Sequence, residues 1–440
     1  MEVCGRLGGR GSFPIEAWVA NMRPLSEDFF MRPKRLLTLA ALCLFLQLSV
    51  DAGDWPQWRG PSRNDVSLET GLLKSWPTKG LKQAWLFKDA GIGYSGFSIS
   101  KGRLFTMGAR ADQELLIALD TKDGHELWAT PMGGVYPNNW GDGPRGTPTV
   151  DGNYVFSLAA KGGLIAADVA TGKTLWKVEA KDFGGKVPDW GYCESVLTDG
   201  DHVIFTPGGA KGAVVALHKM TGKLAWQSKD FTDDAHYSSI ITADLNGAHQ
   251  LIQLTAKSIV GLNSKDGAVL WKSDWQGKVA VIPTPIYKDG HVYVTSGYSV
   301  GCKLVKIDAG NQVSDVYVNK VIKNHHGGVV LVGGHLYGHS DGAGWVCQDF
   351  LTGQEVWSSK AFGKGAVSYA DGMLYCLDEG SGTVVLAEAS TKGWSEKGRF
   401  TLTPQTTLRK RDGRVWTHPV ISNGRLYLRD QELIFAFEVK

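Results

Sequence analysis

Residues 146–176, GTPTVDGNYVFSLAAKGGLIAADVATGKTLW, decide the fold of this 440-residue chain. Short runs rich in β-branched and aromatic residues alternate here with turns that contain glycine, which is the pattern of antiparallel strands joined by tight turns. The stretch reads as strand, tight turn, strand, short loop, strand, glycine turn and strand. Four strands of this length form one antiparallel sheet, the size of a single propeller blade.

The first of these turns recurs eight times along the chain. Glycine is its second residue in every copy, since glycine accepts the positive φ that two-residue hairpin turns require. Successive copies lie 50, 48, 47, 43, 44, 38 and 52 residues apart. A period of about 45 residues with four strands per unit indicates a β-propeller. The pairs are Lys101-Gly102, Asp151-Gly152, Asp199-Gly200, Asn246-Gly247, Asp289-Gly290, Gly333-Gly334, Asp371-Gly372 and Asn423-Gly424.

The glycine turn between the third and fourth strands occurs only seven times, because the chain after Asn423-Gly424 has room for two more strands but not three. Lys82-Gln83-Ala84-Trp85 looks like the missing outer strand. We therefore predict an all-β fold over 82–440, an eight-bladed β-propeller of four-stranded antiparallel blades with a ring closed by an N-terminal strand. Residues 53–81, with Trp55 and Trp58, are expected to pack on this ring.

Composition agrees with a repeat protein of many turns and large aromatic side chains. The 56 glycines make up about 13% of the chain, against a usual value of ~7%. Six tryptophans recur on the fourth strands and are expected to pack between blades: Trp85, Trp128, Trp176, Trp226, Trp271 and Trp357, with Tyr317 and Phe400 at the equivalent places. A formal net charge of +3 without a long basic block argues against a nucleic-acid partner.

The N-terminal region carries an export signal. Basic residues after Met31 precede an apolar run, Leu36–Val50, and Ala52 is a small residue at a plausible cleavage site. We assign 31–52 to a signal peptide and 1–30 to a mis-called upstream extension. The mature chain is then a soluble periplasmic or extracellular protein with no transmembrane span, and we expect a monomer. Its four cysteines, Cys193, Cys302, Cys347 and Cys376, follow no disulfide or metal spacing and are expected to be free thiols.

The string Ala-x-Asp-x-x-Thr-Gly-x-x-x-Trp, formed by Ala166, Asp168, Thr171, Gly172 and Trp176, resembles the tryptophan-docking repeat of the pyrroloquinoline-quinone (PQQ) propeller family. The resemblance covers Trp85 to Lys440. It implies an eight-bladed propeller, and it implies one of two quite different functions. Some members are quinoprotein alcohol dehydrogenases that hold PQQ with calcium, whereas outer-membrane-assembly propellers bind no quinone and catalyse nothing.

Three functions therefore stay open. The first is a non-catalytic binding or assembly scaffold for another envelope protein or a polymeric ligand. The second is a PQQ-dependent alcohol dehydrogenase, of the polyvinyl-alcohol-dehydrogenase kind among others, with PQQ and calcium as cofactors. The third is a glycan- or metal-binding propeller, although no metal ligand set can be named from the sequence.

Candidate site residues come from one face of the ring. The loops that leave the fourth strands share this face with the turns between second and third strands, and it is rich in aromatic residues and histidine. A ligand or cofactor could be held there by Trp140, Arg145, Trp190, Tyr192, Glu194, Tyr237 and Trp416. If the protein is an enzyme, the candidates for acid–base catalysis or for steadying an oxyanion are His236, His326, His418, Arg145 and Asp142.

Overall fold

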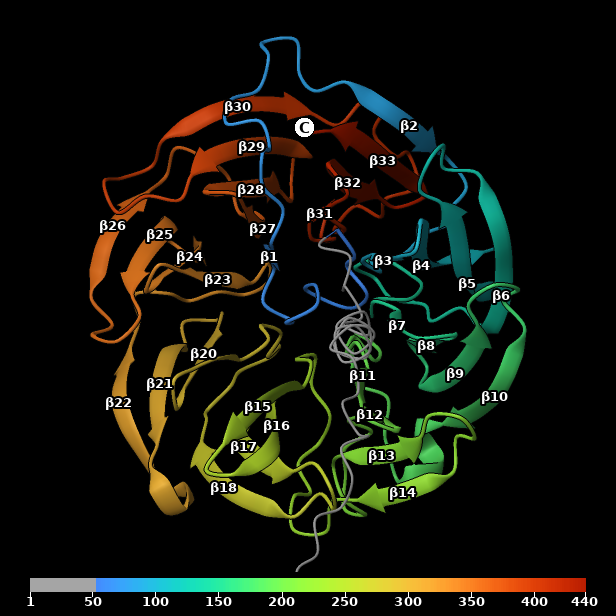
Figure 1. Ribbon diagram of the computed structural model, residues 1–440, viewed down its shortest axis with the longest axis vertical. Coiled ribbons are helices and arrows are strands. Elements are labelled where there is room, and N and C mark those ends of the chain that lie inside the picture. Colours follow the sequence, from blue (N-terminus) through green and yellow to red (C-terminus); the bar gives the residue numbers. More distant parts are fainter. Residues whose placement is uncertain (1–52) are drawn as a thin grey trace, which may run out of the picture. The chain divides into compact units, whose positions relative to one another are not determined.

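Eight β-sheets stand in a ring around a central axis (Figure 1). The computed structural model describes residues 53–440, and the predicted signal peptide and upstream extension lie outside the described residues. Seven sheets have four strands and one has five. The prediction of an all-β, eight-bladed propeller is therefore confirmed. In the described part of the chain the helices are two short 3-10 turns, η1 (Ala180–Phe183) and η2 (Ala309–Asn311).

Each blade runs from an inner strand near the axis to an outer strand at the rim. Blades 1 and 2 are β3 (Ser98–Ser100), β4 (Arg103–Arg110), β5 (Gln113–Asp120), β6 (Glu126–Gly134), and β7 (Thr149–Asp151), β8 (Tyr154–Leu158), β9 (Gly163–Asp168), β10 (Thr174–Glu179). Blades 3 and 4 are β11 (Leu197–Asp199), β12 (His202–Phe205), β13 (Val215–His218), β14 (Leu224–Gln227), and β15 (Ile241–Leu245), β16 (Ala248–Leu254), β17 (Ser258–Asn263), β18 (Val269–Asp274).

The second half of the ring repeats this order. Blades 5 and 6 are β19 (Ile286–Lys288), β20 (His291–Ser296), β21 (Gly301–Ile307), β22 (Val313–Asn319), and β23 (Val329–Val332), β24 (His335–Ser340), β25 (Gly344–Asp349), β26 (Glu355–Ser359). Blade 7 is β27 (Gly365–Ala370), β28 (Met373–Asp378), β29 (Thr383–Glu388) and β30 (Glu396–Thr401). Blade 8 combines β31 (Val420–Ser422), β32 (Arg425–Asp430) and β33 (Leu433–Glu438) with β2 (Gln83–Phe87).

The ring closes as predicted, because β2 pairs antiparallel with β33 and places Trp85 opposite Ala436. This pairing gives the last blade its outer strand from the other end of the chain. It also removes an open strand edge that could otherwise pair with another molecule.

Large aromatic side chains on the outer strands join each blade to the next. The Trp176 Nε1–H donates to the Lys219 carbonyl of the following blade at 2.8 Å. A Cβ on Gly222, in the same turn, would lie 2.8 Å from the indole, so only glycine fits under the ring there. Trp85, Trp128, Trp226, Tyr317 and Trp357 donate in the same way to Thr121, Val169, Ser264, Phe350 and Ser390. Trp271 differs, since its Nε1–H donates to Gln250 within its own blade at 2.8 Å.

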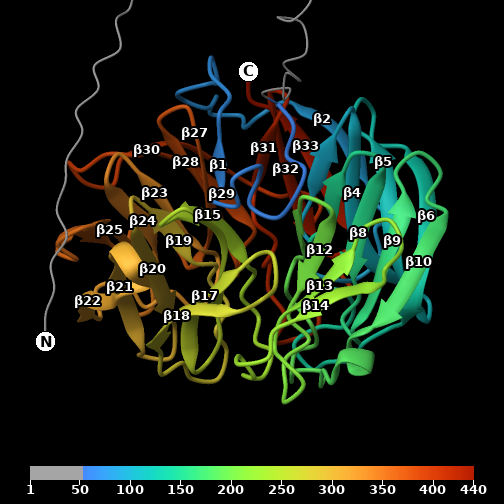
Figure 2. The same cartoon turned by 60° about the horizontal axis from the view of Figure 1, so that its bottom comes forward.

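The N-terminal segment enters the centre of the ring and forms a plug, which we define as residues 54–67. Its last two residues form β1 (Val66–Ser67), which pairs in parallel with the inner strand β27 and makes blade 7 five-stranded. Figures 1 and 2 both show β1 near the axis, inside β27. Arg59 and Asp65 form an ion pair at 2.7 Å with both side chains 1% exposed. Arg63 donates to the Ser195 carbonyl at 2.6 Å.

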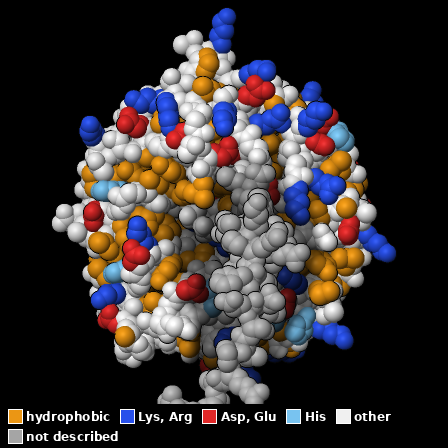
Figure 3. Space-filling model, in the orientation of Figure 1, with side chains coloured by type: hydrophobic (Ala, Val, Ile, Leu, Met, Phe, Trp, Pro, Cys, Tyr) orange, Lys and Arg blue, Asp and Glu red, His pale blue; other side chains and the backbone are white. Residues whose placement is uncertain are grey.

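The surface charge is mixed. On the face shown in Figure 3, Lys and Arg side chains alternate with Asp and Glu around the rim, and neither sign forms a block. All four cysteines in the described residues are free thiols, as predicted. None of the helices within residues 53–440 is long and apolar enough to cross a membrane.

Candidate functional site

A cavity of about 200 Å³ lies on the axis of the ring, at the face formed by the loops that leave the outer strands. We call it the central cavity, and the face the loop face. The side chains around it come mainly from loops between successive blades, and Trp58 of the plug forms part of its wall. The lining residues are Trp58, Tyr94, Trp140, Arg145, Trp190, Cys193, Ser195, Tyr237, Ser239, Ala280, Ile282, Tyr298, His325, His326, Gly327, Trp416, Thr417 and His418.

Aromatic rings dominate one wall of the central cavity. The Trp416 ring lies 4.9 Å from the Tyr94 ring and 6.5 Å from the Trp140 ring, measured between centroids. The Tyr94 hydroxyl donates to the Trp140 carbonyl at 2.6 Å. Lys410, from the loop before β31, pairs with Asp142, from the loop before β7, at 2.7 Å. These contacts tie two loops together that are more than 260 residues apart in sequence.

Seven of the residues that the sequence singled out line the cavity: Trp140, Arg145, Trp190, Tyr237, His326, Trp416 and His418. Four lie elsewhere. Asp142 is paired with Lys410, and His236 accepts a hydrogen bond at Nδ1 from the Val281 N–H at 3.4 Å. Tyr192 packs in the core between blades and donates to the Pro207 carbonyl at 3.0 Å. Glu194 is 1% exposed and accepts hydrogen bonds from the Thr206 N–H and hydroxyl at 2.6 and 3.1 Å.

The lining carries positive charge without negative charge, because Arg145 lines the cavity and no Asp or Glu does. One Nη2 hydrogen of Arg145 is used by the Gly141 carbonyl at 2.7 Å, and the guanidinium lies 5.1 Å from the Tyr94 ring. Within residues 53–440 it has no carboxylate partner, and its Nε is buried without a hydrogen-bond partner. This guanidinium therefore keeps unused donors beside the cavity.

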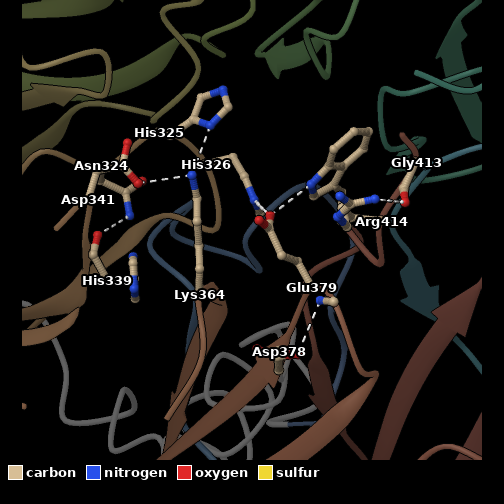
Figure 4. A network of polar contacts seen from close by, with 12 residues as sticks. Asn324, His325, His326, His339, Asp341, Lys364, Asp378, Glu379, Gly413 and Arg414 are labelled. Carbon is tan, nitrogen blue, oxygen red and sulfur yellow. Dashed lines mark hydrogen bonds and ion pairs between the residues drawn. The ribbon is translucent and has the colours of Figure 1, made fainter. Parts of the chain in front are cut away.

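Beside the cavity, Glu379 fixes two of the lining side chains. It accepts a hydrogen bond from the Trp416 Nε1–H at 2.9 Å and a short one from His326 Nε2 (Figure 4). Burial acts to raise the pKa of Glu379, but the hydrogen bond from His326 and the charges of His326 and Lys364, with the Trp416 bond, outweigh it and lower the pKa to about 2. Burial lowers the pKa of His326, and the hydrogen bond and charge of Glu379 act in the opposite direction.

A second chain of contacts runs from blade 7 to the cavity. Lys364 pairs with Asp341 at 2.9 Å and contacts His325 Nδ1 at 3.0 Å, as Figure 4 shows. His325 Nε2 in turn contacts the Tyr298 hydroxyl at 3.0 Å. Burial, with the neighbouring His326 and Lys364, lowers the pKa of His325 to about 4, so it is neutral at pH 7.

The family model described as "Outer membrane protein assembly factor BamB" matches residues 111–359, more than half of the chain. The chain belongs to this family of PQQ-like propellers. The resemblance found in the docking repeats is thereby confirmed.

Relatives and solved structures agree with this assignment. BamB of Yersinia pestis is 23% identical over 324 residues, which span 70% of this chain and 76% of the relative. BamB from Moraxella catarrhalis shares the fold with a TM-score of 0.57 at 17% identity, over 82% of this chain and 98% of that one. The quinohemoprotein alcohol dehydrogenase of Comamonas testosteroni also shares the fold, with a TM-score of 0.62 at 13% identity over 88% and 80% of the two chains.

Because BamB and a quinoprotein share this fold, the residues must be tested against PQQ with calcium. Calcium takes about six to eight oxygen ligands, usually with several carboxylates. The cavity lining contains no carboxylate, and no group of three or more His, Cys, Asp or Glu in residues 53–440 is placed to hold a metal ion. The residues of this BamB-family chain therefore do not fit a calcium-bound quinone.

Eleven of the eighteen lining residues of this BamB-family chain were not singled out from the sequence as ligand-binding, and Trp58 and Tyr298 are two of them. Trp58 was assigned to packing, but it lines the cavity and donates from Nε1 to the Thr284 hydroxyl at 3.0 Å. No local pattern marks it, since its segment reaches the axis only through tertiary contacts. Tyr298 lies in the turn between β20 and β21, where Tyr298-Ser299 stand in place of glycine. The absence of glycine or asparagine at these two turn positions was the sequence signal that could have marked Tyr298 as a functional residue.

Proposed function

We propose that this protein is an exported, non-catalytic scaffold of the cell envelope, which takes part in outer-membrane protein assembly by holding another envelope protein or a polymeric ligand on its loop face. The family match and the BamB relatives support the class of function. The observation that carries the proposal is the central cavity, which offers aromatic surface and hydrogen-bond donors but no set of free catalytic groups. Such a concave aromatic surface suits binding.

The histidines of the cavity favour binding over acid–base catalysis. Both ring nitrogens of His325 are occupied, by Lys364 and by Tyr298. His418 Nδ1 is held by Asp65 at 3.1 Å, and its ring lies 4.6 Å from the Trp58 ring. His326 uses Nε2 for Glu379, and its Nδ1 is buried. A general base needs a nitrogen within reach of the substrate proton, and His325 and His326 offer none to the cavity. Among these three imidazoles, the Nε2 of His418 is the nitrogen that is neither hydrogen-bonded within residues 53–440 nor fully buried.

The PQQ-dependent alcohol dehydrogenase is the competing function. Its support is the shared fold of the quinohemoprotein, and fold by itself does not carry function. A dehydrogenase would also need a way to hold quinone without the carboxylate set that calcium requires. A metal-binding propeller lacks support because no carboxylate lines the cavity. A glycan would be one form of the polymeric ligand.

The test compares strains of the organism that carries this gene. We expect deletion to lower the amount of assembled outer-membrane proteins, measured as heat-modifiable species on gels, and the wild-type gene to restore it. Trp140→Glu should not restore it, because Trp140 is 45% exposed on the loop face. Leu351→Glu is the matched control, since Leu351 is 56% exposed in the turn between β25 and β26, on the opposite face. We expect it to restore assembly fully.

Two results would overturn the proposal. One is unchanged outer-membrane protein assembly in the deletion strain. The other is saturable PQQ binding with calcium by the purified protein, together with dye-linked oxidation of an alcohol, which would establish the dehydrogenase.

A further inference from the structure

The turn that carries Tyr298 has an unfavourable backbone. The Val300 N–H donates to the Gly297 carbonyl at 3.1 Å, which closes a two-residue turn between β20 and β21. Both central residues have positive φ, +55° at Tyr298 and +63° at Ser299. Turns of this kind favour Asn-Gly or Gly-Gly because other side chains are strained there. Strain that is kept at a cavity wall points to a use for the side chain.

That use is not packing in the core. Tyr298 is 38% exposed and lines the central cavity. Its hydroxyl contacts His325 Nε2 at 3.0 Å, and no other side-chain partner is found among residues 53–440. The strained turn therefore presents a phenol to the cavity.

The chemistry of the supporting chain fixes the direction of this hydrogen bond. An ammonium group can only donate, so Lys364 donates to His325 Nδ1 and the imidazole proton lies on Nε2. Nε2–H then donates to the Tyr298 oxygen, and the Tyr298 O–H remains free to donate to a ligand. Asp341, paired with Lys364 at 2.9 Å, holds the ammonium in place.

Arg145 stands in the loop between β6 and β7, and Tyr298 in the turn between β20 and β21. Figure 1 shows these two pairs of strands on opposite sides of the ring. Arg145 too has donors to spare, and no carboxylate lines the space between it and Tyr298. The lining therefore offers the donors of Arg145, which is charged, and of Tyr298, on a background of aromatic rings. Guanidinium groups of this kind bind carboxylate and phosphate through charge-assisted hydrogen bonds.

We propose that the central cavity binds an organic anion that carries a single flat ring, with Arg145 holding the anionic group and Tyr298, positioned by His325 and Lys364, donating a second hydrogen bond. The cavity of about 200 Å³ suits one ring. The proposal rests on the proposed function, because it names the chemistry that a partner or polymer must present to the loop face. Carboxylate and phosphate share this chemistry, and the test separates them.

The test titrates the purified protein with benzoate, phenyl phosphate and neutral benzamide, followed by tryptophan fluorescence and calorimetry. At least one anion should bind with a stoichiometry near one, and benzamide should bind about tenfold more weakly or not at all. The stronger of the two anions identifies the group that Arg145 prefers. Arg145→Met should weaken anion binding about tenfold or more, and Tyr298→Phe about threefold to tenfold.

Lys364 is tested as a positioning residue. Lys364→Met should weaken anion binding as Tyr298→Phe does, but should add nothing in the Tyr298→Phe background, because both variants break the same chain. Lys323→Met is the matched control, since Lys323 lies on the loop face without an ion pair in the described residues, and it should bind like wild type. Thermal unfolding checks that every variant is folded.

The proposal falls if benzamide binds as tightly as the anions, if no anion binds, or if Arg145→Met and Tyr298→Phe bind normally while folded. Its failure is distinguishable from failure of the proposed function. Loss of outer-membrane protein assembly on deletion, without anion binding, leaves the scaffold standing and removes this ligand. If the protein binds the anion but deletion of its gene leaves outer-membrane protein assembly unchanged, the anion site is supported and the role in assembly is refuted.

Discussion

Asp65→Ala should be among the most damaging single changes to this protein, because it leaves the guanidinium of Arg59 buried without its counter-charge. The two side chains are each 1% exposed and 2.7 Å apart. Asp65 also accepts from His418 at 3.1 Å, so the change loosens the cavity wall as well as the plug. Removing one partner of a buried ion pair costs about 3–5 kcal/mol.

The expected shift of the melting temperature follows from the size of the propeller. Residues 53–440 are 388 residues, being 440 less the 52 outside the described part. An unfolding entropy of about 2.1 cal/mol/K per residue gives about 0.8 kcal/mol/K. The loss of about 3–5 kcal/mol therefore lowers the Tm by about 4–6 °C. Differential scanning calorimetry at pH 7 measures it directly.

Two further variants make this result specific. Glu438→Ala breaks an exposed ion pair with Lys82, in which the two charged atoms are 3.0 Å apart. The Lys82 side chain is 76% exposed and the Glu438 side chain 40%, so the change should cost less than about 1 kcal/mol. Arg59→Met combined with Asp65→Ala should recover part of the loss, since no buried charge is left alone. The reasoning is refuted if Asp65→Ala lowers the Tm no more than Glu438→Ala does. It is also refuted if adding Arg59→Met to Asp65→Ala lowers the Tm further instead of raising it.

The remaining predictions concern two carboxyl groups and one glycine. Burial raises the pKa of Glu194 from 4.5 to about 7. Its contribution to stability is therefore complete below about pH 4.5 and is lost as the pH rises through 7. The Tm of wild type should fall between pH 5 and pH 8, and Glu194→Gln should reduce that fall. An equal fall in both proteins would contradict this origin. The pKa of Glu379 is lowered from 4.5 to about 2, so its contribution to stability is present above pH 4.5 and is lost toward pH 2. The Tm of Glu379→Gln should fall less than that of wild type between pH 5 and pH 3. A steeper fall in the variant would contradict a lowered pKa at Glu379. Gly222→Ala should lower the Tm more than Gly152→Ala, because both have positive φ, +68° and +61°, but only Gly222 would bring a Cβ against an indole. Equal losses would mean that the Trp176 contact contributes little.

Much of the fold was predictable because its determinants are local in the chain. The strands of one blade follow one another through short turns, so the eight glycine pairs and their spacing predict eight sheets. The closure was also predictable, since Trp85 repeats the outer-strand pattern at the far end of the chain. β1 was not predicted, because a two-residue parallel pairing leaves no periodic signal.

The candidate site was predictable only as a face. The sequence places Trp140, Arg145, Trp190, Tyr237 and Trp416 in loops of that face, and the structure brings all five to one cavity. It could not separate them from Tyr192 and Glu194, which lie in the same loop as Trp190 but turn into the protein. Along the extended segment, Cys193 and Ser195 face the cavity while Tyr192 and Glu194 point to the other side, and the sequence does not show which side faces the axis. Trp190 lies before that segment, in a turn closed by the Gly191 N–H, which donates to the Pro188 carbonyl at 2.8 Å.

The sequence by itself determined the blade, the number of blades and the strand that closes the ring, because each depends on residues within about one repeat of each other or on a repeated motif. Only the tertiary structure decided that the plug fills the axis, that Asp65 pairs with Arg59 beneath His418, and that Arg145 and Tyr298 face one cavity. These facts depend on loops from different blades converging after the ring has closed. The charge, burial and free hydrogen-bonding atoms of the site are set by that convergence, so no single repeat contains them.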